Sequence, residues 1–325
     1  MAMRTKGLER FLARADSLEG LHGREVPHLA ESGAGEEAAA PGEPGCSVKQ
    51  LPERLLMKAA EVASRLNPVN EPVFGRIAAA AEGALPTPMA AAVITSKYWG
   101  PRPRKLTVSF LDNAPVDLRR RIVTHLNAWA RFGCIEFVET SGVGQIRIAR
   151  ELKGYWSYLG TDVLLIPQHL PTLNLQGFTM STDEREFRRV VRHEAGHTLG
   201  MPHEHMRREL VNRIDRQKAY DYFLRNQGWS RAAVDQQVLT PLEDASIMAT
   251  PADEDSIMCY QLPGAITVDG KPIRGGVDIT ASDAEFVARV YPRAGGLPGM
   301  GRGSTESDWA ESDDVRDEDL LIDAA

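Results

Sequence analysis

The chain has 325 residues, a hydrophobic fraction of 42% and a formal net charge of -7, as expected of a globular protein with one large or two small domains. The acidic excess lies at the C-terminus, where residues 306–325 hold nine acidic residues and one Arg, so the remainder is nearly neutral. Without a basic excess, nucleic acid and anionic membranes are not expected partners. No apolar run approaches the ~18 residues of a membrane span. The oligomeric state is left open.

Both ends of the chain are predicted to be disordered: a leader at residues 1–45 rich in Gly, Ala and Glu, and an acidic tail at residues 294–325. The N-terminus carries charge but lacks the apolar segment of an ordinary secretory signal. The cysteines, Cys46, Cys134 and Cys259, are too few and too scattered for a disulfide framework. We therefore expect a cytoplasmic protein, with non-classical export as the alternative.

Residues 46–90 predict a helical N-terminal extension, a possible pro-segment. Apolar residues recur at helical spacing from Leu51 to Leu66, and Asn67-Pro68 ends that pattern. A second helix is expected from Val73 to Ala84. The Pro-rich residues 85–88 then mark a boundary.

Residues 91–293 have the regular patterns of a compact domain. The expected strands are Leu106–Phe110, Ile135–Val138, Ile146–Ile148 and Val163–Ile166. The expected helices are Val116–Phe132, a helix through residues 193–197 with Ser181 and Glu184 as its capping box, Asp215–Gln227 before Gly228, and a last helix from Thr280 to near Tyr291. Strands followed by helices predict an α+β fold with a site between two lobes.

One stretch, residues 193–203, reads HEAGHTLGMPH and has the pattern of a metal site. His193 and His197 are four residues apart, so on a helix they share one face and can bind one tetrahedral zinc ion. Glu194 lies beside the first ligand, where its carboxylate can take a proton from a zinc-activated water. This pattern predicts a hydrolytic zinc centre.

The third ligand, His203, requires the helix to end first. Gly200 is suited to the left-handed conformation that ends helices, and Pro202 disfavours continuation. The resulting turn can bring His203 back to the metal. Three histidines leave one zinc position open for water, as in catalytic rather than structural sites.

With this motif, Ser256-Ile257-Met258-Cys259-Tyr260 makes the chain resemble the astacin-like metzincin proteases from about Val93 to Pro292. The resemblance implies an α+β, metzincin-type zinc protease fold, with a twisted mixed sheet and active-site helix over a smaller C-terminal lobe. It implies that Met258 packs beneath the zinc ligands. It also implies that the Tyr260 phenol binds zinc or stabilises the oxyanion.

Further segments resemble this family, and some depart from it. Glu204 matches a Glu that receives the mature N-terminus in related enzymes, and residues 155–158 resemble the edge strand that pairs with extended substrate. Cys259 stands where the family often has His; its sulfur could bind zinc, but a small buried residue is the preferred interpretation. The Asp-containing motif by which many astacins block their zinc is not recognisable. Cys46 is either a blocking zinc ligand or a plain loop residue.

The sequence therefore predicts a zinc-dependent endopeptidase in residues 91–293, acting on protein or peptide substrates. Zn²⁺ is held by His193, His197 and His203, with Glu194 as general base and Tyr260 as oxyanion partner. Two alternatives are a zinc hydrolase of a non-protein amide, such as a cell-wall peptide, and a non-catalytic zinc-binding module.

Overall fold

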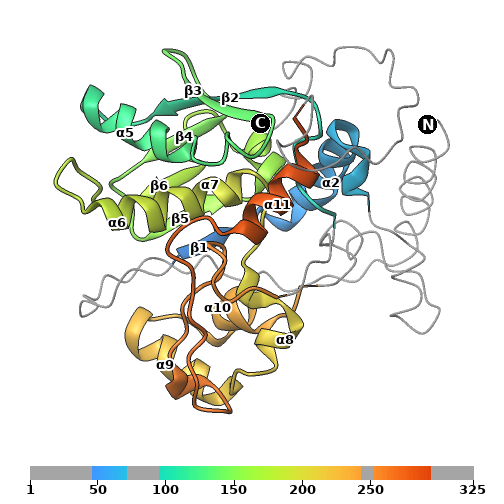
Figure 1. The fold of residues 1–325 in the computed structure, drawn as a ribbon, viewed down its shortest axis with the longest axis vertical. Helices are drawn as coiled ribbons and strands as arrows, with labels where there is room; N and C mark the ends of the chain where they lie inside the picture. Colours follow the sequence, from blue (N-terminus) through green and yellow to red (C-terminus); the bar gives the residue numbers. More distant parts are fainter. Residues whose placement is uncertain (1–45, 72–94, 243–251, 294–325) are drawn as a thin grey trace.

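The structure, a computed structural model, describes residues 46–71, 95–242 and 252–293. Both ends predicted to be disordered, the expected helix Val73–Ala84 and the boundary at residues 85–88 lie outside the described residues. The described chain forms two lobes, an upper one built on the sheet and a lower one of short helices (Figure 1). Within these ranges, no helix is long and apolar enough to cross a membrane.

The upper lobe contains a six-stranded sheet in the order β1-β5-β6-β4-β2-β3. The strands are β1 (Cys46–Lys49), β2 (Arg104–Phe110), β3 (Ile135–Glu139), β4 (Ile146–Ala149), β5 (Tyr155–Tyr158) and β6 (Leu173–Leu175). Among these described strands only the β5–β6 pair is antiparallel, which confirms the mixed sheet. Because every residue of β4 is buried, this strand lies at the centre of the core.

Helices cover the sheet and carry the site. They are α5 (Val116–Leu126), α6 (Glu184–Glu186), the π-helical η3 (Phe187–Val191) and α7 (Arg192–Thr198). Figure 1 shows α6 and α7 following one another across the sheet. The side chains of Ile122 from α5, Phe187 from η3 and Ala195 from α7 are fully buried in the main core. Packing against the sheet thus fixes the position and orientation of α7.

The lower lobe follows α7 and has its own core, which includes Phe223, Val238 and Cys259. Its elements are η4 (Glu204–Met206), α8 (Arg208–Val211), α9 (Arg216–Gln227), α10 (Arg231–Val234), the π-helical η5 (Asp235–Leu239) and η6 (Gly264–Ile266). The last helix, α11 (Ala281–Val290), returns to the core of the upper lobe. These two cores confirm the predicted large and small lobes.

Predicted helix ends were most accurate where a cap determines them. Asp215 accepts the Lys218 N–H at the start of α9, and Gly228 ends it with φ +69°. The predicted cap Ser181 is wrong, because the Asp183 side chain accepts the Arg185 N–H and starts α6 two residues later.

Two other predicted elements differ from the structure. The helix expected to reach Phe132 ends at Leu126. The side-chain amide of the next residue, Asn127, forms hydrogen bonds with both the N–H and the C=O of Phe137 on β3. The strand predicted at Val163–Ile166 is wrong, because Gly160–Leu165 is a 3₁₀ helix, η2. Gly160 has φ +47°, and the next N–H donates to the Lys97 carbonyl, so the chain turns there.

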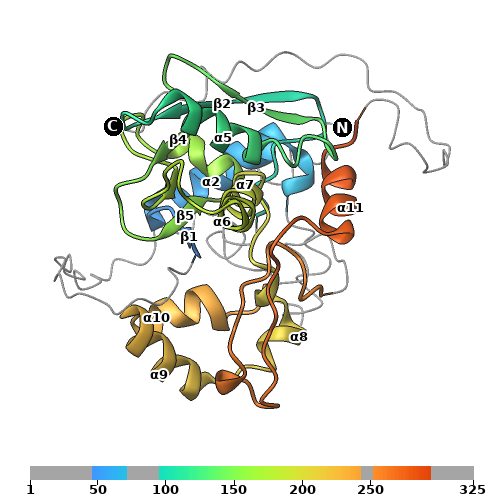
Figure 2. The same cartoon turned by 60° about the vertical axis from the view of Figure 1, so that its left-hand side comes forward.

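The extension expected to be helical begins instead as a strand. β1 joins the sheet edge, and α2 (Glu53–Leu66) and η1 (Pro68–Asn70) follow. Figures 1 and 2 both place β1 beside β5, on the side of the upper lobe that faces α10. Val62 of α2 belongs to the main core, and the Asn70 amide bonds both N–H and C=O of Tyr98. Residues 46–71 are therefore an integral part of the folded upper lobe.

Candidate active site

Three imidazoles meet where α7 ends. His193 and His197 lie one turn apart on α7, and Gly200, with φ +90°, reverses the chain towards His203. A side chain at Gly200 would approach the Lys97 carbonyl to 2.9 Å, so both space and φ require glycine. The ring centroid of His193 lies 4.6 Å from that of His197 and 5.3 Å from that of His203. The turn predicted from Gly200 is present.

Hydrogen bonds set the tautomers of the first two imidazoles. The Nδ1 of His193 lies 2.5 Å from the Ile257 carbonyl, and the Nδ1 of His197 lies 2.8 Å from the Met201 carbonyl. Because a carbonyl only accepts, each Nδ1 carries the proton and each Nε2 keeps a free lone pair. The Nε2 atoms of His197 and His203 face each other at 3.1 Å, while that of His193 has no hydrogen-bond partner among the described residues.

These imidazoles are neutral, as metal ligands must be. Burial lowers the pKa of His193 to about 4, and burial also lowers the pKa values of His197 and His203 well below the ordinary histidine value. Neutral, buried nitrogens whose lone pairs converge on one point match the preference of zinc for imidazole. The residues present therefore fit a zinc ion.

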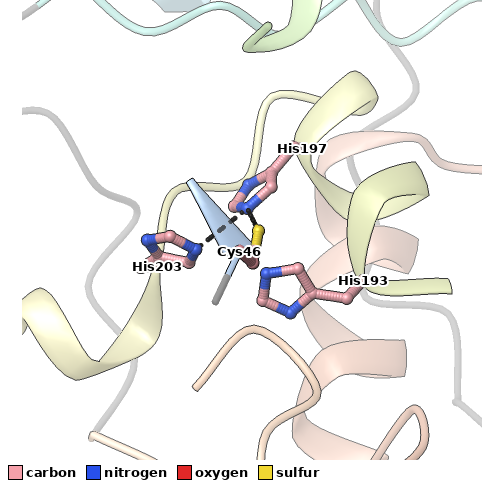
Figure 3. Close-up of side chains that lie close together, drawn as sticks. All are labelled: Cys46, His193, His197 and His203. Carbon is pink, nitrogen blue, oxygen red and sulfur yellow. Dashed lines mark hydrogen bonds between the residues drawn. The ribbon is translucent and has the colours of Figure 1, made fainter. Parts of the chain in front are cut away.

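A fourth ligand type joins this group from a distant part of the chain. The Sγ atom of Cys46, on β1, lies 3.5 Å from the Nε2 of His197 (Figure 3). The ligand atoms of Cys46 and the three histidines all lie within 4.8 Å of one another, and all four residues are buried. Burial and the neighbouring Glu194 raise the pKa of this thiol well above its ordinary value. Of the two interpretations left open by the sequence, the geometry favours the zinc ligand.

Glu194 is fully buried beside these ligands. Within the described part of the chain, neither of its carboxylate oxygens has a hydrogen-bond partner of ordinary geometry, which is unusual for a buried acidic group. Burial raises the pKa of this carboxyl to about 8, while the adjacent Cys46 thiol and the more distant Arg189 act in the opposite direction. A buried carboxyl of this kind, next to a cluster of metal ligands, is suited to holding a proton during a reaction.

The segment Ser256–Tyr260 forms the floor beneath α7. The sulfur of Met258 lies directly against the position that a side chain at Gly196 would occupy, so the first Gly of the zinc motif makes room for it. Asp283, at the start of α11, accepts the Ser256 hydroxyl and the Ile257 N–H, at 2.6 Å and 3.0 Å. Sequence reasoning missed this role, because Asp283 also completes a helix capping box with Thr280.

Tyr260 lies beside the cluster without belonging to it. Its ring centroid is 6.3 Å from that of His203, and its hydroxyl accepts a hydrogen bond of 3.1 Å from the Gln227 amide. Burial raises the pKa of the phenol to about 12, so it is a hydroxyl donor at neutral pH. Gln227 was not predicted, since nothing in the sequence separates it from other polar residues at a helix end.

Two other predicted residues lie near the site. Cys259 is 3% exposed, packs in the core of the lower lobe and is outside the ligand cluster, which agrees with its interpretation as a small buried residue. Glu204 accepts the Asp253 N–H and lies 3.9 Å from Arg207. Burial raises the pKa of Glu204 to about 7.

Comparison with known proteins bears on this geometry. The family model of astacin, a peptidase family, matches residues 94–268, which is more than half of the chain. "Zinc metalloproteinase nas-27" of Caenorhabditis elegans is 31% identical over 99 residues, which are 30% of this chain but only 21% of that protein. The match therefore spans about a fifth of the length of that relative.

Solved structures are also similar. A solved structure of myroilysin superposes on this chain with a TM-score of 0.58 and 32% sequence identity. The match covers 61% of this chain and 97% of that one. A hatching enzyme zinc-protease from the medaka fish Oryzias latipes matches with a TM-score of 0.39 and 19% identity, over 57% of this chain and 87% of that one. Cys46 lies outside the residues matched by the family model.

Proposed function

We propose that this chain, which belongs to the astacin family and is a zinc metalloendopeptidase, uses Glu194 as its general base and is held latent by Cys46. One observation supports the roles of both Glu194 and Cys46. Three neutral imidazoles, one thiol and one carboxyl are buried together where α7 ends, and the carboxyl oxygens have no hydrogen-bond partner of ordinary geometry among the described residues.

Zinc held by His193, His197 and His203 supplies Lewis acidity to the attacking water and the scissile carbonyl. The remaining chemistry belongs to Glu194. Its carboxylate takes the proton of the attacking water and returns it to the departing amine. Because no described residue fixes a hydrogen-bond donor of good geometry on its oxygens, both oxygens are available for this transfer. A non-catalytic module would have no use for such a group.

Latency follows from the place of Cys46. Its thiol lies among the three imidazoles, with all four ligand atoms within 4.8 Å of one another, so it would take the zinc position that a catalytic centre leaves to water. The strand that carries it, β1, also pairs with the edge strand β5, where an extended substrate would add to the sheet. One short segment therefore blocks both the metal and the main-chain binding edge.

Tyr260 is proposed to stabilise the oxyanion after leaving Gln227. Tyr260→Phe removes only the hydroxyl, so we expect kcat to fall roughly tenfold in an active chain, with zinc content unchanged. Peptide hydrolysis and elemental analysis measure the two quantities. Tyr220→Phe is the matched control, because that hydroxyl donates to Asp235 in the lower lobe. Equal rates for Tyr260→Phe and the control would leave Tyr260 with a packing role.

Metal removal tests the proposed function as a whole. We expect about one zinc per chain, loss of peptide hydrolysis with o-phenanthroline, and recovery on adding zinc, because three histidines alone hold the metal during turnover. Protein, peptide and peptidoglycan substrates compared in one assay distinguish an endopeptidase from a cell-wall amide hydrolase. Hydrolysis that survives chelation would contradict the zinc mechanism.

A further inference from the structure

We propose that Gln237 is a main-chain clamp of the active-site cleft, which binds the backbone of the substrate residue two positions from the one at the metal. This inference rests on the proposed function, since it assigns a further substrate-binding residue to the same site. Gln237 lies on η5 in the lower lobe, and its side chain contacts β1, which pairs with β5. β1 is also the segment whose Cys46 joins the cluster of zinc ligands.

The Gln237 amide makes two hydrogen bonds with one residue of β1. The Val48 N–H donates to Oε1 at 3.1 Å, and Nε2 donates to the Val48 carbonyl at 3.1 Å. These are the bonds that a neighbouring strand would make. The other edge of β1 pairs with β5, where Val48 lies opposite Ser157. A four-residue strand is therefore held on both edges, by β5 on one and by a single side chain on the other.

This contact does not depend on the side chain that is bound, because both bonds go to the backbone. Val48 follows Cys46 by two residues, which separates the clamp from the metal by roughly 6–7 Å along a strand. Any extended chain that places a peptide at the metal and pairs with β5 presents a backbone N–H and C=O there. The clamp thus contributes affinity for extended chains without selecting their sequence.

Strand direction does not restrict the clamp. Reversing a strand exchanges the positions of its N–H and C=O groups, and a half-turn of a Gln amide exchanges its donor and acceptor. Gln237 can therefore bind β1, which runs parallel to β5, and equally a substrate running the opposite way. A carboxylate at this position lacks the donor and cannot do so.

Gln237 is also held firmly. Its neighbours Val238 and Leu239 are each 1% exposed in the lower-lobe core. The His205 Nε2–H donates to the Gln237 carbonyl at 3.0 Å, and the His205 Nδ1 accepts the Tyr260 N–H at 3.3 Å. The clamp is therefore tied to the backbone of the segment under the zinc ligands. The π-helical turn that carries it is a feature often found at functional sites.

The test compares Gln237→Met with Gln236→Met, an exposed neighbour on the same element, both in the full chain carrying Cys46→Ala. The readout is the ratio of kcat/KM for a long peptide to that for peptides shortened at either end. Because a competing β1 segment lowers both values equally, this ratio reports only the substrate contact. We expect Gln237→Met to lower this ratio about tenfold for peptides shortened at one of the two ends. The reason is that the long peptide loses two hydrogen bonds to Gln237. Equal ratios in the two variants would overturn the proposal.

A second measurement needs no catalysis. In the metal-free chain with Cys46 intact, mass spectrometry follows alkylation of Cys46, with Cys134 as the internal reference. Gln237→Met should speed alkylation of Cys46 about tenfold over Gln236→Met, because β1 loses the hydrogen bonds on one of its two edges. Equal alkylation rates would show that the amide does not hold the strand. If alkylation changes but no variant hydrolyses peptide, the proposed function fails while the clamp on the segment stands.

Discussion

Cys46→Ala in the full chain is expected to raise the rate of peptide hydrolysis roughly 10²-fold over the native chain. A thiol tethered beside the metal has a high effective concentration and binds zinc strongly, so it fills the fourth position almost completely. Alanine provides no ligand and keeps the strand backbone that pairs with β5. Hydrolysis of a fluorogenic peptide, at matched zinc content, measures the effect.

Cys134→Ala is the control, because that thiol is half-buried against the Pro101 carbonyl and outside the ligand cluster. A readout independent of activity is the sulfur-to-metal charge-transfer absorption of the cobalt-substituted chain, which should disappear in Cys46→Ala alone. A rate equal to that of the native chain, with the absorption band absent from both, would remove the thiol from the mechanism of latency.

Glu194→Gln, introduced into the active Cys46→Ala chain, is expected to lower kcat by roughly 10²- to 10⁴-fold. Glutamine has nearly the same size but cannot accept and return the proton. It should also fit the fully buried position, where the carboxyl has no hydrogen-bond partner of good geometry to lose among the described residues. We therefore expect unchanged zinc content and unchanged thermal unfolding, so that the loss of rate reports the chemical step.

Glu209→Gln, the same substitution at an exposed position of α8, is the matched control. Zinc content is measured by elemental analysis and unfolding by calorimetry. A Glu194→Gln chain that cleaves at nearly the rate of the control would assign proton transfer to another group. Loss of zinc along with activity would instead give Glu194 a role in holding the ligands.

Much of the zinc centre could be predicted from sequence because its residues are local. His193, Glu194 and His197 lie within about one turn of α7, and Gly200 determines the turn that brings in His203. Local capping likewise placed both ends of α9 correctly. Such features depend on spacing and backbone conformation, which a short stretch of sequence specifies by itself.

Other features depend on contacts between distant segments, which no local pattern contains. The buried run at Val163–Ile166 reads as a strand, but the turn at Gly160 against the Lys97 carbonyl makes the segment before Ile166 a 3₁₀ helix. Gln237 follows the identical Gln236, and only the packing of η5 directs one of them towards β1.

Cys46 shows most clearly the difference between features that local sequence determines and features that depend on contacts between distant segments. The sequence by itself predicted a zinc peptidase with three histidine ligands, and it left this thiol, 151 residues before His197, without a settled role. Only the pairing of β1 with β5 brings the sulfur to 3.5 Å from the His197 Nε2. The histidines placed by helical spacing were predictable, whereas the proposed blocking ligand depends on a sheet contact between segments far apart in the chain.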